Sequence, residues 1–228
     1  MVTNWFKINI SNLKNDRFIR FDVDYVEISR EFQNSNHTNY LKNYLTFIET
    51  GKSIDKEDYN INGQPSEYAH ITVRNIVQGE LNLKDLIYLN EDKGITLKNF
   101  QIEKGDILIA ISSNVGVSCL VETVPSNLQL TLSHYIVKIK VDTSRINPKL
   151  LVYYLNSSKI KNYFRSVETG KTLKNLSKNY IYNLPISLPK NTQKQLEIVK
   201  RIQPIETDIL KIKASIKEPL EIINSVFF

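Results

Sequence analysis

The strongest chemical signal in the sequence is a basic and aromatic stretch between Lys138 and Lys190. It holds eleven Lys or Arg residues, six Tyr or Phe residues and only two acids, Asp142 and Glu168. The 228-residue chain has a formal net charge of +6, so this stretch carries all of the excess positive charge. Because lysine and arginine neutralise phosphates and aromatic rings contact bases, the pattern indicates a nucleic-acid partner. The alternative is a solvated basic face whose tyrosines lie in the core.

Patterns typical of catalytic sites are incomplete. Gly51-Lys52-Ser53 and Gly170-Lys171-Thr172 each resemble the end of a phosphate-binding loop. Such a loop requires an earlier glycine, at positions where this chain has Thr46 and Arg165, so both matches fail. An adenine methyltransferase would need an Asn-Pro-Pro-aromatic motif, but here Asn147-Pro148 continues with lysine.

One acidic pattern leaves a metal-dependent nuclease as an enzymatic alternative. Asp85, Glu91 and Lys93 match the acid and lysine order of many such enzymes. Those residues must project from a strand to share a divalent cation, whereas Asn90 to Gly94 is predicted to be a turn. The three histidines are scattered and Cys119 is the only cysteine, so no metal site is expected. We therefore expect no catalytic activity and no cofactor.

The spacing of apolar residues predicts a mixed α/β domain. A helix is expected from about Thr38 to Ile48, ended by Gly51. Further helices are expected to begin at Asn147-Pro148 and at Ser157 or Ser158, the latter ending at Gly170. Residues Ile181 to Leu188 are expected to be extended because of Pro185 and Pro189. The predicted strands are Trp5–Ile10, Ile71–Val73, Ile107–Ile111, Val117–Val121 and Tyr135–Val141.

A long helix is predicted at the C-terminus, where Thr192 and Gln195 form a capping-box pattern. Isoleucines then recur at alternating spacings of four and three, at Ile198, Ile202, Ile205, Ile209, Ile212 and Ile216. This heptad-type seam favours a coiled-coil-type helix that packs on a second long helix. Packing of the helix on its own domain is the alternative. Pro204 and Pro219 are expected to bend or shorten the helix.

Several short stretches, in their order and spacing, resemble the specificity subunit of type I restriction-modification systems. They cover roughly residues 38 to 203 and are Ile71–Ile76 with Gly79–Leu81, Lys104–Ile109 with Ser112 and Val115–Gly116, Asn147–Leu151 with Tyr153–Ser157, and Leu184–Pro189 with Gln195 and Ile198–Val199. The chain departs from the family where an acidic pair before the helix glutamine is replaced by Gln193-Lys194.

The resemblance implies a half-subunit with one target recognition domain, at residues 1–189, followed by a conserved-region helix at residues 190–228. The domain would read half of a bipartite site on double-stranded DNA. The helix would pair with a second copy or a sister half-subunit and dock a DNA methyltransferase (modification) subunit, possibly with a restriction subunit. We find no membrane-spanning or signal segment in the sequence and expect a cytoplasmic protein.

Four segments are implied to contact DNA by analogy with the loops of the family. Arg can bind guanine and Asn adenine, while Lys and Ser mostly contact phosphate. The candidate residues are Lys52, Ser53, Arg74, Asn75, Ser112, Ser113, Asn114, Lys171, Thr172 and Lys174. A surface ion pair for Arg74 and ordinary turn chemistry for Ser112 to Asn114 are the alternatives.

Two other functions stay open at this point. The chain could be an interaction protein that binds a restriction-modification complex and retunes or inhibits it, with weak affinity for DNA. It could also be the nuclease suggested by Asp85, Glu91 and Lys93. An assay of DNA binding distinguishes the interaction protein from a specificity subunit. An assay of metal-dependent cleavage distinguishes the nuclease from both.

Overall fold

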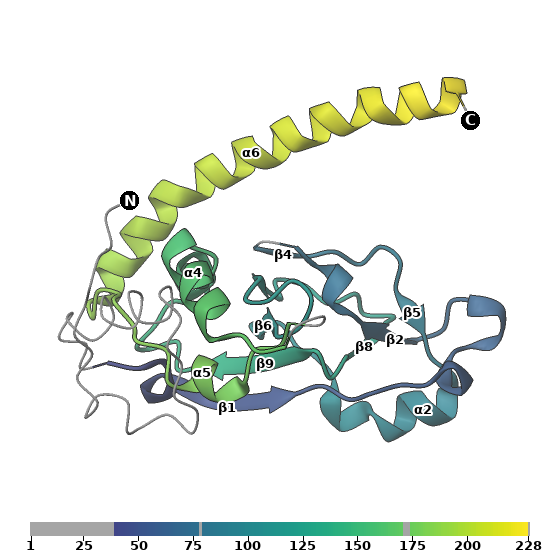
Figure 1. The fold of residues 1–228 in the computed structure, drawn as a ribbon, viewed down its shortest axis with the longest axis horizontal. Helices are drawn as coiled ribbons and strands as arrows, with labels where there is room; N and C mark the ends of the chain where they lie inside the picture. Colours follow the sequence, from purple (N-terminus) through teal and green to yellow (C-terminus); the bar gives the residue numbers. More distant parts are fainter. Residues whose placement is uncertain (1–38, 78, 171–173, 228) are drawn as a thin grey trace, which may run out of the picture.

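The computed structural model describes residues 39–77, 79–170 and 174–227 (Figure 1). Along the last helix it describes the side chains as far as Ile212, and that of Ser215. The helices are η2 (Leu41–Asn43), η3 (Lys56–Asp58), η4 (Ile61–Gly63), η5 (Val73–Asn75), α2 (Glu91–Thr96), η6 (Lys98–Phe100), α3 (Pro148–Leu155), α4 (Ser158–Val167), α5 (Lys178–Tyr182) and α6 (Thr192–Phe227). The strands are β1 (Leu45–Thr50), β2 (Tyr68–Ile71), β3 (Ile76–Val77), β4 (Glu80–Leu81), β5 (Ile87–Tyr88), β6 (Ile107–Ala110), β7 (Ser118–Leu120), β8 (Gln129–Leu132) and β9 (Ile136–Val141). The expected mixed α/β domain with a long C-terminal helix is confirmed.

The described strands form two main sheets and a hairpin. The larger sheet has the order β1-β9-β6-β7 and all of its pairs are antiparallel. The smaller sheet has the order β5-β2-β8, in which β2 and β8 run parallel. Strands β3 and β4 form the separate hairpin.

Strand β6 separates the two largest hydrophobic cores. Ile107 and Ile109 belong to the core that α3, α4 and α5 cover, whereas Leu108 and Ala110 belong to the core shared with β2 and β8. Successive strand residues point to opposite faces, so a strand buried on both faces reads as a continuous apolar run. The sequence Ile-Leu-Ile-Ala meets that requirement. The predicted strand is confirmed, and it pairs antiparallel with β7.

The predicted helix at Thr38–Ile48 is wrong. Only η2 is helical there, and β1 follows it and pairs with β9 along the edge of the larger sheet. Leu45 and Ile48 pack against the helix-covered core from this strand, so tertiary pairing overrides the helical spacing. Gly51 does not end a helix. A Cβ there would lie 2.2 Å from the carbonyl oxygen of Leu132, so the chain can pass this point only as glycine.

Three further local expectations are corrected or lie outside the described residues. The predicted turn at Asn90 to Gly94 is the start of α2, because the Asn90 side chain accepts a hydrogen bond from the amide of Lys93. Residues Ile181 and Tyr182, expected to be extended, belong to α5, and the chain becomes extended only before Pro185. The strand expected at Trp5–Ile10 lies outside the described residues.

The first turns of α6 are fixed to the domain. Asn191, not Thr192, caps the helix, since its side chain accepts from the amide of Lys194 at 3.0 Å. The buried Gln195 amide does not complete a capping box. It accepts from the amide of Asn147 at 2.7 Å and donates to the carbonyls of Arg145 and Pro189 at 3.0 and 2.7 Å.

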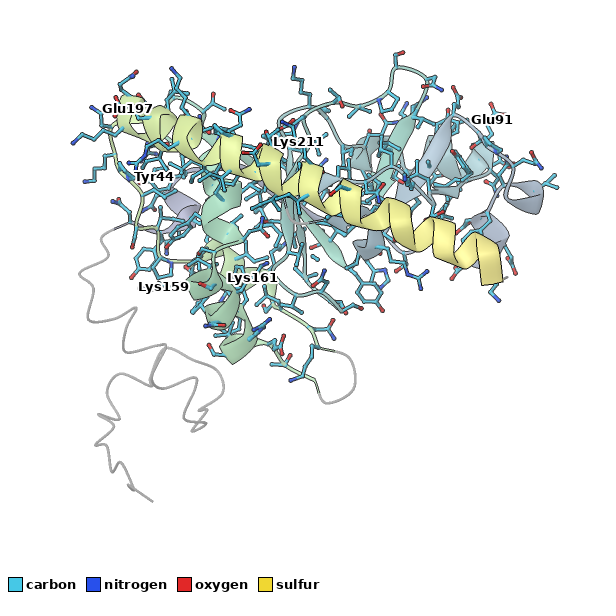
Figure 2. All side chains as sticks on the ribbon, turned by 90° about the horizontal axis from the view of Figure 1, so that it is seen from above. Tyr44, Glu91, Lys159, Lys161, Glu197 and Lys211 are labelled. Carbon is cyan, nitrogen blue, oxygen red and sulfur yellow. The ribbon has the colours of Figure 1, made fainter. Side chains whose placement is uncertain are left out.

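Further along, α6 contacts α3 and the β3-β4 hairpin through one carboxylate. The hydroxyl of Tyr153 donates to Glu206 at 2.6 Å, and Lys149 Nζ lies 3.3 Å from the same carboxylate. A Cβ on Gly79 would lie 2.8 Å from Glu206 Oε1. Burial raises the pKa of Tyr153, and the hydrogen bond to Glu206 raises it further, so the phenol stays protonated. Figure 2 shows α6 crossing over the domain from Glu197 to Lys211.

The isoleucine seam divides along the helix. Ile198 and Ile202 are half-buried, whereas Ile205, Ile209 and Ile212 are 60%, 46% and 58% exposed. The chain's own domain thus partly covers the start of the seam, at Ile198 and Ile202, whereas Ile205, Ile209 and Ile212 stay exposed. The side chain of Ile216 lies outside the described part. Coiled-coil pairing stays a prediction, and α6 continues as helix through Pro204 and Pro219.

Candidate nucleic-acid interface

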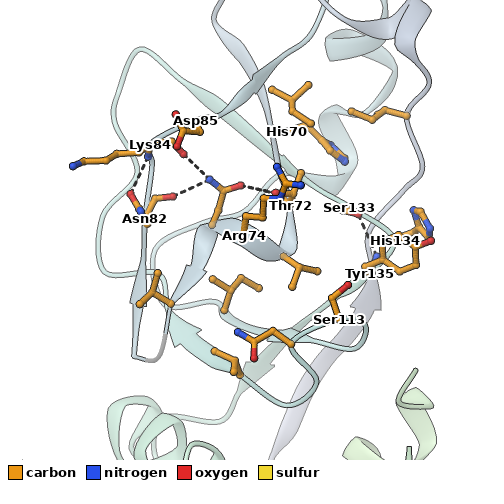
Figure 3. A pocket seen from close by; sticks show the side chains of 18 of the residues that line it. His70, Thr72, Arg74, Asn82, Lys84, Asp85, Ser113, Ser133, His134 and Tyr135 are labelled. Carbon is orange, nitrogen blue, oxygen red and sulfur yellow. Dashed lines mark hydrogen bonds between the residues drawn. The ribbon is translucent and has the colours of Figure 1, made fainter. Parts of the chain in front are cut away.

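A cleft of about 1240 Å³ opens between the smaller sheet and the loop that follows β6 (Figure 3). It is lined by Thr72–Val77, by Asn82 with Lys84 and Asp85, by Ser113–Asn114 and by Ser133–Tyr135. Lys161 reaches it from α4. Segments that are up to about ninety residues apart in the sequence therefore converge on one concave surface. Of the ten candidate DNA-binding residues, the cleft brings together Arg74, Asn75, Ser113 and Asn114.

The loop around η5 presents Arg74 and uses Asn75 to hold its shape. The Asn75 carboxamide oxygen accepts from the amide and the hydroxyl of Thr72 at 2.9 and 3.0 Å. Its nitrogen donates to the carbonyls of Asn82 and Lys84 at 3.0 and 2.9 Å. Asn75 is buried and its hydrogen-bonding capacity is used, so it supports the loop and cannot read a base. Arg74 is exposed beside it.

The loop after β6 places Ser113 and Asn114 in solvent and Ser112 in the interior. Ser112 is buried and forms a backbone bridge with Asn175. Its side chain therefore supports the loop instead of making the expected contact with DNA. The bridge brings Asn175, and Thr169 that pairs with it, beside the loop. Lys174, which precedes Asn175, lies 3.4 Å from the carboxylate of Glu168, outside the cleft. Lys171 and Thr172 lie outside the described residues.

Two strained backbone positions border the cleft. Asp85 and Ser113 are the non-glycine residues with positive φ in the described ranges, at 54° and 60°. The left-handed region costs an L residue energy, and such residues concentrate at functional sites. Both side chains line the cleft, which supports a functional role for this surface.

Lys52 and Ser53 lie next to the cleft without lining it. Residue 52 pairs with the end of β8, through Lys52 N to Leu132 O at 2.8 Å and His134 N to Lys52 O at 3.1 Å. The Lys52 ammonium lies 4.5 Å from the centre of the Phe100 ring. Ser53 Oγ lies 3.0 Å from Nδ1 of His134, which does line the cleft.

Sequence reasoning missed several cleft residues, among them Lys84, Lys161, His134 and Tyr135. The sequence predicts that Tyr135 begins a strand, whereas the structure places it with His134 in the short connection between β8 and β9. His70, also in the cleft wall, is buried and bonded through Nδ1 to Thr131 Oγ1 at 2.9 Å. Burial, and then the charge of His134, lowers the pKa of His70 to about 4, so it is neutral at physiological pH.

The basic stretch does not form one face. Lys138 is buried and donates to the carbonyl of Gln101 at 2.8 Å, and Lys140 is paired with Glu103. Lys149 lies 2.8 Å from Glu122 and also contacts Glu206. Acids from outside the stretch thus neutralise part of its charge, which corrects the expectation that its excess charge as a whole faces a polyanion.

The nuclease pattern is not assembled. Asp85 lies in the cleft wall and Glu91 is exposed on α2, while Lys93 is paired with Asp58 at 2.9 Å. The hydrogen bond from the Asp55 amide, followed by that from Lys93, lowers the pKa of Asp58. The described residues hold no group of three His, Cys, Asp or Glu that could bind a metal, and none of their helices could span a bilayer.

The sequence profile of the type I restriction modification DNA specificity domain family matches residues 47–221. No curated protein sequence matches the chain. Among solved structures, the chain is similar to a type I restriction-modification S subunit from M. genitalium, with a TM-score of 0.51 and 16% identity over 76% of this chain and 40% of that chain. It is also similar to an HsdS subunit from Thermoanaerobacter tengcongensis, with a TM-score of 0.53 and 17% identity over 84% of this chain and 46% of the other.

A third similar structure is the type IIG restriction endonuclease BpuSI, with a TM-score of 0.56 and 11% identity over 80% of this chain and 28% of that enzyme. At these identities the likeness concerns the fold. The chain spans less than half the length of each of these structures.

Proposed function

The chain belongs to the family of type I restriction-modification DNA specificity domains, and we propose that its cleft binds duplex DNA and directs a type I-like methyltransferase to its target. The observation that carries this proposal is the convergence of Arg74, Ser113 and Asn114 on one cleft from loops distant in sequence. The family is defined by DNA specificity, and the chemistry of these side chains suits base edges.

Each residue of this set has a role that follows from its chemistry. The exposed guanidinium of Arg74 can donate two hydrogen bonds to O6 and N7 of guanine, and Asn114 can bind adenine through N6 and N7. Ser113 can bind a base edge or a phosphate. Lys84 and Lys161 border the same cleft and are placed to neutralise phosphates that flank the bases.

The remaining candidates belong to the periphery of the proposed interface. We propose that Ser53 positions the ring of His134. Lys174 precedes Asn175, which pairs with Ser112, and we propose that Lys174 contacts a phosphate. The same role is proposed for Lys171 and Thr172. Lys52 is held by backbone pairing beside the cleft and is proposed to contact the outer phosphates.

We propose that the chain works as a half-subunit. Ile205, Ile209 and Ile212 are exposed on its long helix, which supports pairing with a second helix. Two copies, or one copy and a sister half-subunit, would bury these isoleucines between their helices and read two half-sites. The modification subunit would dock on the paired helices, and a DNA partner implies a cytoplasmic location.

An interaction protein that retunes a restriction-modification complex is the second candidate. Because part of the basic stretch is paired internally, such a protein would bind DNA weakly and without sequence preference. The test is selection from a library of randomised duplexes by the purified chain, with and without a type I modification subunit. Enrichment of a defined sequence supports the specificity function. Uniform, weak retention of all duplexes contradicts it and favours the interaction protein.

A further inference from the structure

We propose that His134 is a specificity-determining residue, which donates a hydrogen bond from Nε2 to N7 of a purine in the major groove, and that Ser53 positions its ring. The connection between β8 and β9 carries this histidine into the cleft, where it lines the wall together with Ser133 and Tyr135 (Figure 3). The inference rests on the proposed recognition of DNA by the cleft and assigns one of its contacts.

The backbone of this connection is fixed from three sides. Ser133 N donates to Ile71 O at 2.9 Å and His134 N donates to Lys52 O at 3.1 Å. The carbonyl of Tyr135 accepts from the amide of Ile111 at 2.9 Å. The histidine is therefore held between β2, the end of β1 and the end of β6. A contact that must discriminate between bases needs this kind of rigid support.

The imidazole ring is fixed as well as the backbone. Ser53 Oγ lies 3.0 Å from Nδ1, and the Tyr135 ring lies with its centroid 3.8 Å from that of His134, at an interplanar angle of 42°. The two contacts restrain rotation about the side chain's bonds. They also occupy Nδ1, so that Nε2 is the ring atom that is left to bind a ligand.

No partner of Nε2 is present among the described residues, although the ring is half-buried in the cleft wall. When the Ser53 hydroxyl donates to Nδ1, the proton of the neutral ring lies on Nε2, and a protonated ring also carries one there. Nε2 therefore acts as a donor towards DNA.

The position of the ring favours a base edge over a phosphate. His134 lines the cleft with Arg74, Ser113 and Asn114, whereas the exposed Lys84 is better placed for phosphates. In the major groove a single donor can bind N7 of either purine. His70, the other cleft histidine, is bonded to Thr131 and is buried, so it cannot make this contact.

The test begins with the duplex sequence that the purified full chain selects from a randomised library. Each purine of that sequence is then replaced in turn by its 7-deaza analogue, which lacks the N7 acceptor and keeps the Watson–Crick face. We expect one 7-deazapurine position at which the His134-dependent contact is lost and binding weakens about tenfold, the typical effect of losing a base contact. His134→Ala should bind that analogue and the natural duplex equally.

Matched variants separate the contact from the fold. Ser53→Ala should lose part of the discrimination at the same position, and Ser53→Thr, which keeps a hydroxyl, should restore it. Tyr135→Ala, which removes the ring that packs on His134, should also lose part of this discrimination. Tyr182→Ala is its control, because Tyr182 and Tyr135 are 41% and 37% exposed and Tyr182 lies outside the cleft. Thermal unfolding followed by circular dichroism checks that each variant is folded.

The outcomes distinguish this inference from the proposed function. A chain that enriches no sequence contradicts DNA recognition and the histidine contact together. A chain that enriches a sequence but tolerates 7-deazapurines at every position overturns the histidine contact, together with the N7 contacts proposed for Arg74 and Asn114, and leaves sequence recognition itself standing. A uniform loss of affinity of His134→Ala for all duplexes also overturns it, because such a loss reports a phosphate contact or a structural role.

Discussion

The side-chain oxygen of Gln195 accepts a hydrogen bond from the backbone amide of Asn147 at 2.7 Å, so the first turn of α6 is joined to the residue that caps α3. The nitrogen of the same amide donates to the carbonyls of Arg145 and Pro189. One buried side chain thus fixes where the long helix leaves the domain. This junction therefore sets the direction of the helix relative to the cleft.

Replacing Gln195 with alanine should destabilise the domain. Hydrogen bonds to three partly buried backbone groups would be lost, and at about 0.5–1.5 kcal/mol each their loss should lower the free energy of unfolding by about 2–3 kcal/mol in total. Urea denaturation of Gln195→Ala measures the change. Gln203→Ala, on an exposed position of the same helix, is the matched control and should stay within about 0.5 kcal/mol of the parent. Equal stability of the two variants would contradict the role of Gln195.

Arg74→Ala should relax the preference for one base more than it weakens binding overall. A bidentate arginine contact to guanine contributes about 1–3 kcal/mol of discrimination against other bases. Binding-site selection with the parent and the variant gives the readout, and Arg201→Ala, an exposed arginine on α6, is the control. If Arg74→Ala weakens all duplexes alike, Arg74 contacts phosphate instead of a base.

Lys84→Ala should change the salt dependence of binding. Each phosphate that a lysine neutralises contributes roughly −0.9 to the slope of log K against log salt on duplex DNA. Titration of a labelled duplex at several salt concentrations should therefore give a slope about 0.9 smaller in magnitude for the variant. Lys98→Ala, exposed and outside the cleft, should leave the slope unchanged. An unchanged slope for Lys84→Ala would exclude its phosphate contact.

The exposed isoleucines of α6 should control assembly. Transfer of an isoleucine side chain from water to a buried position lowers the free energy by roughly 1.5–3 kcal/mol. Burial of three isoleucines therefore favours pairing of two helices. Light scattering should show a dimer for the parent and a monomer for the triple variant Ile205→Asp, Ile209→Asp, Ile212→Asp. The control places Asp at Gln203 and Thr207, two exposed positions on the opposite side of the helix. A monomeric parent, alone and with the modification subunit, would show that the proposed pairing is wrong.

The isolated chain should leave duplex DNA intact in the presence of magnesium. Asp85 and Glu91 lie on separate elements and Lys93 is engaged by Asp58, so the nuclease pattern lacks a shared cation site among the described residues. Gel electrophoresis after long incubation with Mg²⁺ gives the readout. Cleavage that is abolished in Glu91→Ala would establish the nuclease that the structure does not support.

Local signals in the sequence predicted the parts of the fold that depend on local chemistry. Asn147 and Ser157 cap their helices as expected, and the apolar run at β6 forms a strand buried on both faces. The predicted helix at Thr38–Ile48 failed because β1 gains its stability from pairing with β9, almost a hundred residues later. Periodicity within a short window does not report such a partner.

The candidate site shows the same limit. Sequence reasoning placed Arg74, Ser113 and Asn114 correctly in exposed loops, but it treated Asn75 and Ser112 as equivalent to them. Their burial depends on contacts with Asn82, Lys84 and Asn175, which no local pattern shows. His134 was missed for the same reason, since its ring is held by a contact with Ser53, eighty-one residues earlier in the sequence.

The left-handed backbone at Ser113 has a consequence for how this protein can evolve. Arg74 and Asn114 have backbone conformations that many residues tolerate, so under the proposed function substitutions at these positions change the recognised sequence while β2, β6 and β8 keep their packing. Position 113 accepts few residue types without strain, chiefly glycine, asparagine and aspartate besides the serine present. Under the proposed function, the backbone therefore permits change of the target contact at positions 74 and 114 and restricts it at position 113.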